Sequence, residues 1–179
     1  MSVNFKIHNM ILSTSVNRPV KLDRLSLKLD KSEYEPEQFP GLVYRTESPK
    51  SGVLLFSSGR LNIVGVKNIR EGREVLSQIV KILDDNGFEV KNKSKLKVEN
   101  IVASAKIAKE INLDKIGFEF ENTEYEPEQF PGLIYRMTEP KLVFLLFSSG
   151  RIVCVGSTKT DDIKKGIAKL LKQIKPFSS

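Results

Sequence analysis

The sequence is poor in the residues from which metal and redox sites are built. It holds one cysteine, Cys154, and one histidine, His8, among 179 residues. A single cysteine cannot close a disulfide within the chain, which fits a reducing cell interior. Zinc sites in proteins need three or four ligands. We therefore expect no metal and no cofactor, and we expect Cys154, in the apolar run IVCVG, to be a small buried hydrophobe.

The motifs of common enzyme classes and the signature of a membrane span are missing as well. No apolar run approaches the length that crosses a bilayer. No glycine-rich nucleotide-binding pattern is present. The Ser-Ser-Gly before Arg60 and Arg151 lacks the Gly-x-Ser-x-Gly of a nucleophile elbow. The sequence therefore predicts a protein that is not an enzyme and has no membrane partner.

Acidic residues are fewer than basic residues in this sequence, 22 against 29. The formal net charge is +7. Lys and Arg exceed Asp and Glu by 13 to 10 through residue 88, and by 16 to 12 in the rest of the chain. An excess of this kind suits a polyanionic partner such as nucleic acid. Because the excess is spread along the chain, we expect both halves to face the same partner.

The most informative feature of the sequence is a duplication. Glu33–Leu42 (EYEPEQFPGL) returns unchanged as Glu124–Leu133, 91 residues later, and LLFSSGR at Leu54–Arg60 returns at the same offset. Two copies of one unit are therefore expected. We place the first repeat at 1–90 and the second at 91–179, joined intimately in one domain.

Hydrophobic periodicity predicts about five strands and two helices in each repeat. The expected strands of the first repeat are 3–16, 31–36, 42–47, 53–57 and 60–67, and its helices are 20–30 and 68–86. The expected second repeat has strands 97–107 and 121–126, three further strands ending near 157, and helices 111–118 and 160–175. Short connections favour an antiparallel α+β fold.

The apolar strands VLLF and VFLLF indicate a sheet that is covered on both faces. The helices can cover only one of these faces. The other face keeps apolar side chains, which the sequence places at Ile11, Leu54, Phe56, Val102, Leu145 and Phe147. Apolar surface of this extent is typical of an interaction site, so we expect a partner to cover it.

The repeated motifs YEPEQFPGLxYR, PK and LLFSSGR, with the pairs Asn9-Met10 and Asn100-Ile101, resemble the archaeal-type core domain of the TATA-box-binding protein family. The resemblance covers essentially the whole chain. It implies a pseudo-twofold saddle, a curved ten-stranded antiparallel sheet with helices on the convex face. This family is itself a standard example of a sheet that reads the minor groove and wedges apolar side chains between bases.

The resemblance also implies roles for individual residues. The intercalating side chains fall on Phe39, Phe56, Phe130 and Phe147. Base contacts fall on Asn9, Asn100, Ile11, Val102, Leu54, Leu145, Val64, Val153 and Val155. Phosphate contacts fall on Arg45, Arg136, Arg60, Arg151, Ser58, Ser149 and Lys67. Contacts to transcription factor B fall on Glu126, Glu128 and Gln129.

The function implied is that of a general transcription factor. It binds double-stranded A·T-rich promoter DNA as a monomer, bends it, and recruits transcription factor B and the RNA polymerase assembly. The expected location is the cytoplasm, at an archaeal nucleoid, or the nucleus of a eukaryotic cell.

Two departures from the family pattern leave alternatives open. The family usually has threonine where this chain has Val64 and Val155, and an apolar residue where it has Asn62. A divergent relative that acts mainly as a protein-recruiting scaffold is one alternative. A sheet module that binds an apolar ligand is the other.

Overall fold

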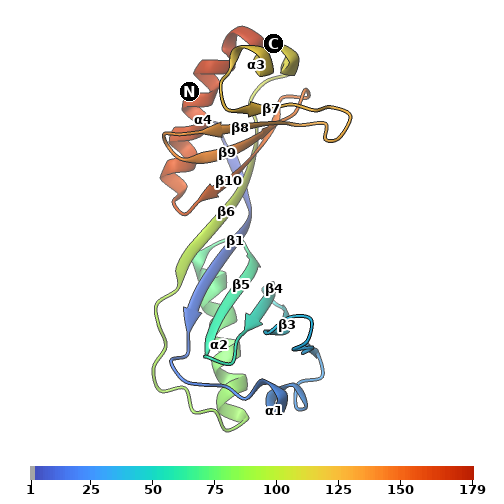
Figure 1. The fold of residues 1–179 in the computed structure, drawn as a ribbon. Coiled ribbons are helices and arrows are strands. Elements are labelled where there is room, and N and C mark those ends of the chain that lie inside the picture. The colour runs from blue at the N-terminus through green and yellow to red at the C-terminus, as the bar shows by residue number, and fades with distance from the viewer. Residues whose placement is uncertain (1–2) are drawn as a thin grey trace. The chain divides into compact units, whose positions relative to one another are not determined.

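The computed structural model describes residues 3–179, which form two compact units. We call Asn9–Glu99 the N-unit, and residues 3–8 with Asn100–Ser179 the C-unit. The division falls within two strands, so each unit contains a few residues contributed by the other repeat. Figure 1 shows the chain in sequence colours.

The first repeat folds as a strand, a short helix, four strands and a long helix. Its elements are β1 (Phe5–Ser15), α1 (Leu22–Ser26), β2 (Ser32–Glu33), β3 (Leu42–Glu47), β4 (Lys50–Leu55), β5 (Arg60–Val66) and α2 (Ile69–Asp85). The second repeat has the same order. Its elements are β6 (Lys97–Lys106), α3 (Leu113–Glu119), β7 (Thr123–Glu124), β8 (Leu133–Met137), β9 (Leu142–Leu146), β10 (Arg151–Ser157) and α4 (Thr160–Ile174), followed by the 3₁₀ turn η1 (Lys175–Phe177).

The strands form one ten-stranded sheet in the order β2-β3-β4-β5-β1-β6-β10-β9-β8-β7. Neighbours within each repeat, such as β3 and β4 or β8 and β9, run antiparallel. The predicted fold class, an α+β fold of two tandem repeats with an antiparallel sheet of ten strands, is confirmed.

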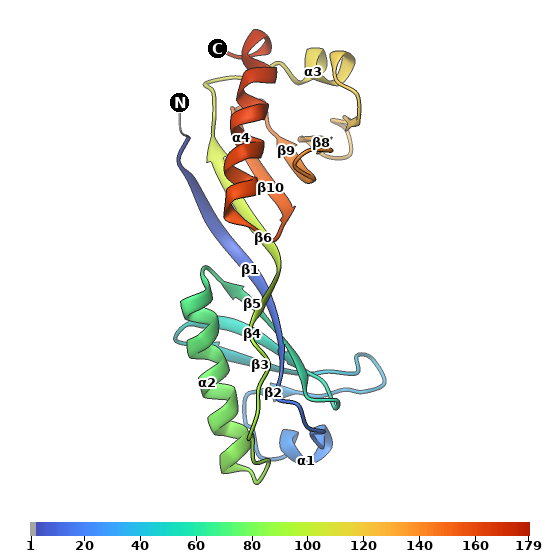
Figure 2. The same cartoon turned by 90° about the vertical axis from the view of Figure 1, so that its left-hand side faces the viewer.

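Within each unit the long helix covers one face of the sheet (Figure 2). Glycine lets α2 and α4 come close, because a Cβ at Gly72 would collide with Leu12 of β1, and one at Gly166 with Leu142 of β9. The strands alternate accordingly. In β1, Met10, Leu12 and Thr14 are buried beneath helices, while the residues between them are half-buried. In each unit the second face of the sheet is therefore covered by none of the helices in residues 3–179, as the sequence predicts.

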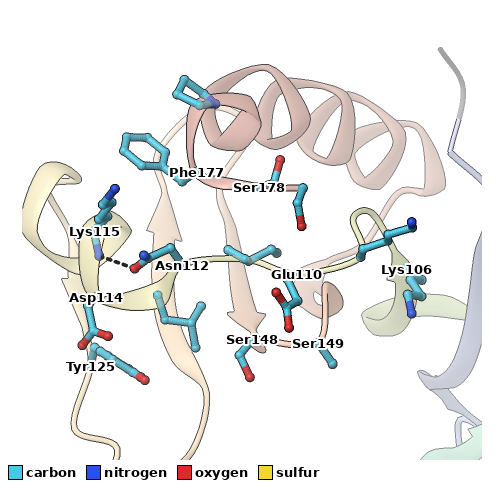
Figure 3. Close-up of a pocket in the computed structure, with 15 residues that line it drawn as sticks. Lys106, Glu110, Asn112, Asp114, Lys115, Tyr125, Ser148, Ser149, Phe177 and Ser178 are labelled. Carbon is cyan, nitrogen blue, oxygen red and sulfur yellow. Dashed lines mark hydrogen bonds between the residues drawn. The ribbon is translucent and has the colours of Figure 1, made fainter.

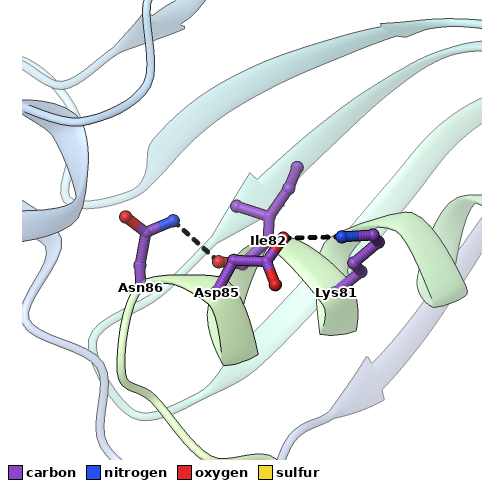
Figure 4. A network of polar contacts seen from close by, with 4 residues as sticks. All are labelled: Lys81, Ile82, Asp85 and Asn86. Atoms are coloured by element: carbon purple, nitrogen blue, oxygen red, sulfur yellow. Dashed lines mark hydrogen bonds and ion pairs between the residues drawn. The ribbon is translucent and has the colours of Figure 1, made fainter.

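The ends of α2 follow standard capping chemistry. The Asn68 side chain accepts a hydrogen bond from the Glu71 backbone amide at its N-terminus. At the other end, Lys81 pairs with Asp85 over 2.7 Å, and the Asn86 amide donates to the Ile82 carbonyl over 2.8 Å (Figure 4). This ion pair is exposed, so it contributes little to stability. The predicted C-cap at Asn86-Gly87 is confirmed by the left-handed backbone of Gly87.

Several elements differ from their predicted extent. The strands expected over 31–36 and 121–126 are only two residues long, Ser32–Glu33 and Thr123–Glu124. The helix expected over 20–30 is one turn, Leu22–Ser26, after which backbone bonds of the i to i+3 kind end it. A segment this short is held by burial of Leu22 and Leu25 rather than by helix propensity. The strand expected over 53–57 is Lys50–Leu55 instead, because the turn before Arg60 takes Phe56 and Ser57 out of the ladder.

Candidate nucleic-acid interface

The open face of each unit carries a row of half-buried side chains that crosses four strands. In the N-unit the row runs across β1, β5, β4 and β3, where Ser13 lies opposite Asn62, Asn62 opposite Leu54, and Leu54 opposite Val43. The equivalent row of the C-unit is Ser104, Val153, Leu145 and Ile134. Opposite residues in an antiparallel pair point to the same face. The strand register thus brings Leu54, Leu145 and Val153 of the predicted base-contacting set onto these faces.

The remaining predicted base-contacting side chains lie beside these rows. Ile11 pairs with Val64 across β1 and β5, and Val155 pairs with Val143 across β10 and β9. Val102 stands two residues from Ser104 on β6, so it points to the same side of the strand. All four side chains are half-buried, with no helix above them.

A pair of phenylalanines stands at the edge of each open face. Phe39 packs edge-to-face on Phe56, with ring centroids 5.9 Å apart at 66°. Phe130 packs on Phe147 in the same way, at 6.0 Å and 71°. Phe39 and Phe130 are each 39% exposed, unlike the fully buried Phe144 of the core. Each ring pair thus presents an apolar edge to solvent.

Glycine makes room for these ring pairs. A Cβ at Gly41 would lie 2.8 Å from Phe39 and 3.1 Å from Phe56. At Gly132 the same atom would lie 2.7 Å from Phe130 and 3.0 Å from Phe147. A Cβ almost never lies closer than 3.0 Å to another side chain, and contacts of 3.0–3.1 Å are uncommon. The Pro-Gly that follows each exposed phenylalanine is therefore part of the packing that orients the rings.

The Phe-Ser-Ser-Gly-Arg turn is anchored by backbone hydrogen bonds. In the N-unit, Gly59 has φ +89°, donates to the Phe56 carbonyl and accepts from the Val16 amide, while Ser57 accepts from Val20. The C-unit repeats these bonds through Gly150 and Ser148. Only glycine adopts this backbone without strain. Phe56 and Phe147 are consequently held in a defined direction.

The two predicted central asparagines have fixed amides. The Asn9 Oδ1 accepts from the Gly65 backbone amide over 2.6 Å, and the Asn100 Oδ1 accepts from Gly156 over 2.8 Å. Both glycines have φ near +90°, at irregularities in the strand pairing that free their amides from the ladder. Because each amide oxygen is engaged, the NH₂ group of each asparagine is left as a donor on the open side.

The predicted phosphate-contacting arginines fall into two kinds. Arg45 pairs with Glu33 over 2.8 Å and Arg136 with Glu124 over 3.4 Å, all on exposed side chains. Arg60 and Arg151 are exposed and make no ion pair with other residues in the described part of the chain. The Arg60 and Arg151 guanidiniums are thus the ones ready to meet an anion.

The other predicted polar contacts are exposed. Ser58 and Ser149 lie in the turns before the two arginines, and Lys67 follows β5. Glu126, Glu128 and Gln129 lie on the loop between β7 and β8, which projects from its sheet (Figure 1). Each phenylalanine of the loop tips follows a turn, in which the Phe39 amide donates to Glu35 and the Phe130 amide to Glu126.

Cys154 is buried in β10, and burial raises the pKa of its thiol to about 12. It is therefore inert as a nucleophile near neutral pH. Residues 3–179 contain no group of three His, Cys, Asp or Glu side chains that could hold a metal ion. None of the helices described is long and apolar enough to cross a membrane.

A hollow of about 920 Å³ lies where the C-terminal residues meet α3 (Figure 3). Its Asn112 caps α3 by accepting from the Lys115 amide over 3.0 Å, and Ser179 accepts from Lys109. Its lining includes exposed lysines and serines, and Ser149 is the single predicted site residue among the residues that line it. A hollow of about 870 Å³ on the open face of the C-unit holds more of the predicted set, namely Val102, Phe147, Ser149, Arg151 and Val153.

The sequence reasoning missed the hydrogen bonds that His8 and Glu99 make on this side of the sheets. His8 Nε2 and Ser104 Oγ lie 2.5 Å apart, and Ser13 Oγ donates to Glu99 over 2.7 Å. The offset of 91 relates His8 to Glu99 and Ser13 to Ser104. The equivalence of these positions in the two repeats was the one signal in the sequence that could have drawn attention to His8 and Glu99.

Comparison with known proteins gives a consistent result. The sequence model of the family described as transcription factor TFIID (or TATA-binding protein, TBP) matches residues 4–86 and 95–177. The chain is 43% identical over 175 residues to the TATA-box-binding protein of Methanocaldococcus jannaschii, covering 98% of this chain and 96% of that protein. It is 45% identical over 170 residues to that of Thermoplasma acidophilum, covering 94% and 92%.

A solved structure is similar over the same extent. The structure of Methanococcus jannaschii TBP superposes with a TM-score of 0.90 at 43% identity, covering 97% of this chain and 99% of that one.

Proposed function

The chain belongs to the TATA-box-binding protein family, and from this premise we propose that it is a general transcription factor whose open sheet faces bind an A·T-rich promoter element. The observation that carries the proposal is the pair of phenylalanines at the edge of each open face, repeated with nearly the same geometry. Two identical wedges on one chain suit a ligand that is itself repetitive, as a DNA duplex is.

The shape and polarity of the open faces suit the minor groove. A row of apolar side chains has few groups with which to read a hydrogen-bond code, and the minor groove offers a poor code. In this account Phe39 with Phe56, and Phe130 with Phe147, each unstack one base step. Flexible TA steps make that deformation cheaper, so the DNA sequence is read partly through its deformability.

Polar contacts refine this recognition. The NH₂ groups of Asn9 and Asn100 donate to the adenine N3 and thymine O2 acceptors, which A·T and T·A pairs share. Val64 and Val155 replace threonines and lack the hydroxyls that the family uses. We infer that discrimination at the centre of the element depends on the two asparagines and on shape.

The phosphate backbone supplies affinity rather than specificity. Arg60 and Arg151 bind phosphates directly. Arg45 and Arg136 do so after exchanging their glutamate partners for the phosphate, which costs little because exposed ion pairs are weak. Ser58, Ser149 and Lys67 add further contacts.

The assembly that follows involves protein partners. The exposed carboxylates of Glu126 and Glu128, with the amide of Gln129, form a polar surface on the second loop tip, and transcription factor B binds there. The monomeric protein on its promoter then nucleates assembly of the RNA polymerase complex. A protein with this function acts where the chromosome lies, which in an archaeal cell is the cytoplasmic nucleoid.

The test uses three duplexes that share one length: an A·T box, a G·C box, and a box in which inosine·cytosine pairs replace every A·T pair. Inosine lacks the amino group of guanine, so I·C pairs look like A·T in the minor groove and like G·C in the major groove. The expected order of affinity is A·T and I·C together, well above G·C. Affinity for I·C as low as for G·C would place the contacts in the major groove and refute the proposal.

The alternatives from the sequence are not favoured. An apolar-ligand module needs an enclosed cavity, whereas the apolar rows here lie on open faces flanked by arginines. A divergent relative that acts mainly as a protein-recruiting scaffold gives no reason for exposed ring pairs in both repeats.

A further inference from the structure

The two open faces are chemically different at one set of equivalent positions. The offset of 91 places Asn62 of the N-unit where the C-unit has Val153, and Glu99 where the other repeat has His8. Ser13 and Ser104, the partners of Glu99 and His8, are identical. The same hydrogen-bonding position is thus filled by a carboxylate in one unit and by an imidazole in the other.

In the N-unit this set forms a group of acceptors. Ser13 lies opposite Asn62 in the register of β1 and β5, so both side chains face the open side. The Ser13 hydroxyl donates to Glu99 over 2.7 Å. That bond, and then the charges of Lys97 and Arg60, lower the pKa of Glu99, which is therefore ionised at neutral pH. The carboxylate and the Asn62 amide oxygen are both acceptors on this face.

In the C-unit the equivalent set is His8, Ser104 and Val153, which carries no carboxylate and replaces the Asn62 amide by an apolar side chain. His8 and Ser104 share a hydrogen bond and line the hollow of about 870 Å³ with Val153 and Phe147. The residues that line this hollow include two lysines and Arg151 but no acidic side chain. Lys6 and Arg151 of this lining have the counterparts Lys97 and Arg60 in the N-unit, where Lys97 lies 3.6 Å from Glu99. The two units therefore differ in the acceptors, because only the N-unit adds a carboxylate and a side-chain amide oxygen at this position.

Base pairs also differ in the hydrogen-bonding groups that they present in the minor groove. In the minor groove, A·T and T·A pairs present only acceptors, whereas a G·C pair adds one donor, the guanine amino group. Against Val153 that donor would be buried without a partner, which is unfavourable. Against Asn62 and Glu99 it finds an acceptor. Conversely, a half-site of A·T pairs sets its acceptors against the Glu99 carboxylate, which is unfavourable.

We propose that Asn62 and Glu99 make the N-unit the reader of a guanine amino group in the minor groove, and that this orients the chain on a box with one G·C pair in one of its halves. The proposal rests on the proposed function, since it assigns one half of the bound element to each unit. It also explains how two repeats with identical phenylalanine loops still distinguish the two ends of their site.

The experiment measures orientation directly. The Glu37→Cys variant carries a tethered iron chelate on the N-unit loop tip, while native Cys154 is buried and does not react with the reagent. The variant is bound to a duplex with a single G·C pair in one half of an A·T box, and strand cutting is compared on the two flanks. A self-complementary A·T box is the control, because it has no distinguishable ends.

The expected result is cutting at least about fivefold stronger on the flank next to the G·C pair, the ratio that corresponds to about 1 kcal/mol of discrimination. Replacing that pair with I·C removes only the amino group and should bring the two flanks to equal cutting. A variant with four substitutions, His8→Glu, Glu99→His, Asn62→Val and Val153→Asn, exchanges the two sets of residues. In this variant the stronger cutting should move to the opposite flank.

Three results separate the ideas under test. Equal cutting on the G·C duplex by the unexchanged protein overturns the inference. Bias that persists on the I·C duplex also overturns it, and this arm does not depend on whether the exchanged protein folds. Failure to bind any of the duplexes refutes the proposed function itself, a different outcome from binding without orientation.

Discussion

The packing of each ring pair predicts that a single methyl group will damage DNA binding without unfolding the protein. In Gly41→Ala the new Cβ meets Phe39 at 2.8 Å and Phe56 at 3.1 Å. Contacts of that kind relax only if the rings move by several tenths of an ångström. Phe39 is 39% exposed, so it has space to move away. The strain is then released as loss of the edge-to-face contact, about 0.5–1.5 kcal/mol.

Because the rings of the free protein no longer match the geometry that wedges between bases, we expect the affinity for an A·T box to fall about tenfold, or ~1.4 kcal/mol. The midpoint of thermal unfolding should change by a few degrees at most. Fluorescence anisotropy on a labelled duplex measures the first quantity, and circular dichroism the second.

Gly117→Ala is the matched control, because a Cβ at Gly117 meets nothing closer than 3.5 Å and lies in α3, away from the rings. It should leave affinity unchanged. Unchanged affinity in Gly41→Ala as well would refute the view that these glycines set the geometry of the ring pairs.

The structure makes three further predictions. Replacing both Arg60 and Arg151 by alanine should reduce the slope of log affinity against log salt concentration by about 1.8, because two phosphate contacts are lost. A salt titration measures this slope, and an unchanged slope would show that neither residue contacts DNA. Burial raises the pKa of Cys154 from 9.0 to about 12, so the unfolded chain loses the thiol proton first as pH rises. The free energy of unfolding in urea should therefore fall by about 1.4 kcal/mol per pH unit between pH 9 and 12 relative to Cys154→Ala, and parallel curves would contradict the burial argument. Glu128→Arg should preserve DNA affinity and weaken the ternary complex with transcription factor B in a gel-shift assay, whereas loss of DNA binding alone would count against its assigned role.

The elements that could be predicted from the sequence are those whose hydrophobic periodicity matches the face that is buried in the fold. The duplication and the amphipathic stripe of α2 gave boundaries within one residue, because a long helix is buried along one face and capped at both ends. The helix over 20–30 was overextended, because leucines at helical spacing do not tell a single buried turn from three turns. Of those leucines, Leu22 and Leu25 are buried, whereas Leu29 is only half-buried.

The candidate interface was predicted as a set of residues but not as a geometry. The orientation of the Asn9 side chain depends on an irregularity in the strand pairing at Gly65, which frees the Gly65 backbone amide to donate to Asn9 Oδ1. The sequence pattern does not predict which acceptor such a backbone amide will find. The pairing of His8 with Ser104 joins residues 96 positions apart. Side-chain contacts of that range follow from strand register, which becomes known only when the sheet is known.

The central claim is that the two phenylalanine pairs bend DNA, and bending itself is the quantity to measure. Donor and acceptor dyes at the two ends of a short A·T-box duplex report its end-to-end distance by energy transfer. The wild-type protein should raise the transfer sharply, and the variant with Phe56→Ala and Phe147→Ala, compared at saturating protein and shown by circular dichroism to be folded, should leave the duplex close to straight. A straight duplex with the wild-type protein, or equal bending by the double variant, would contradict the account.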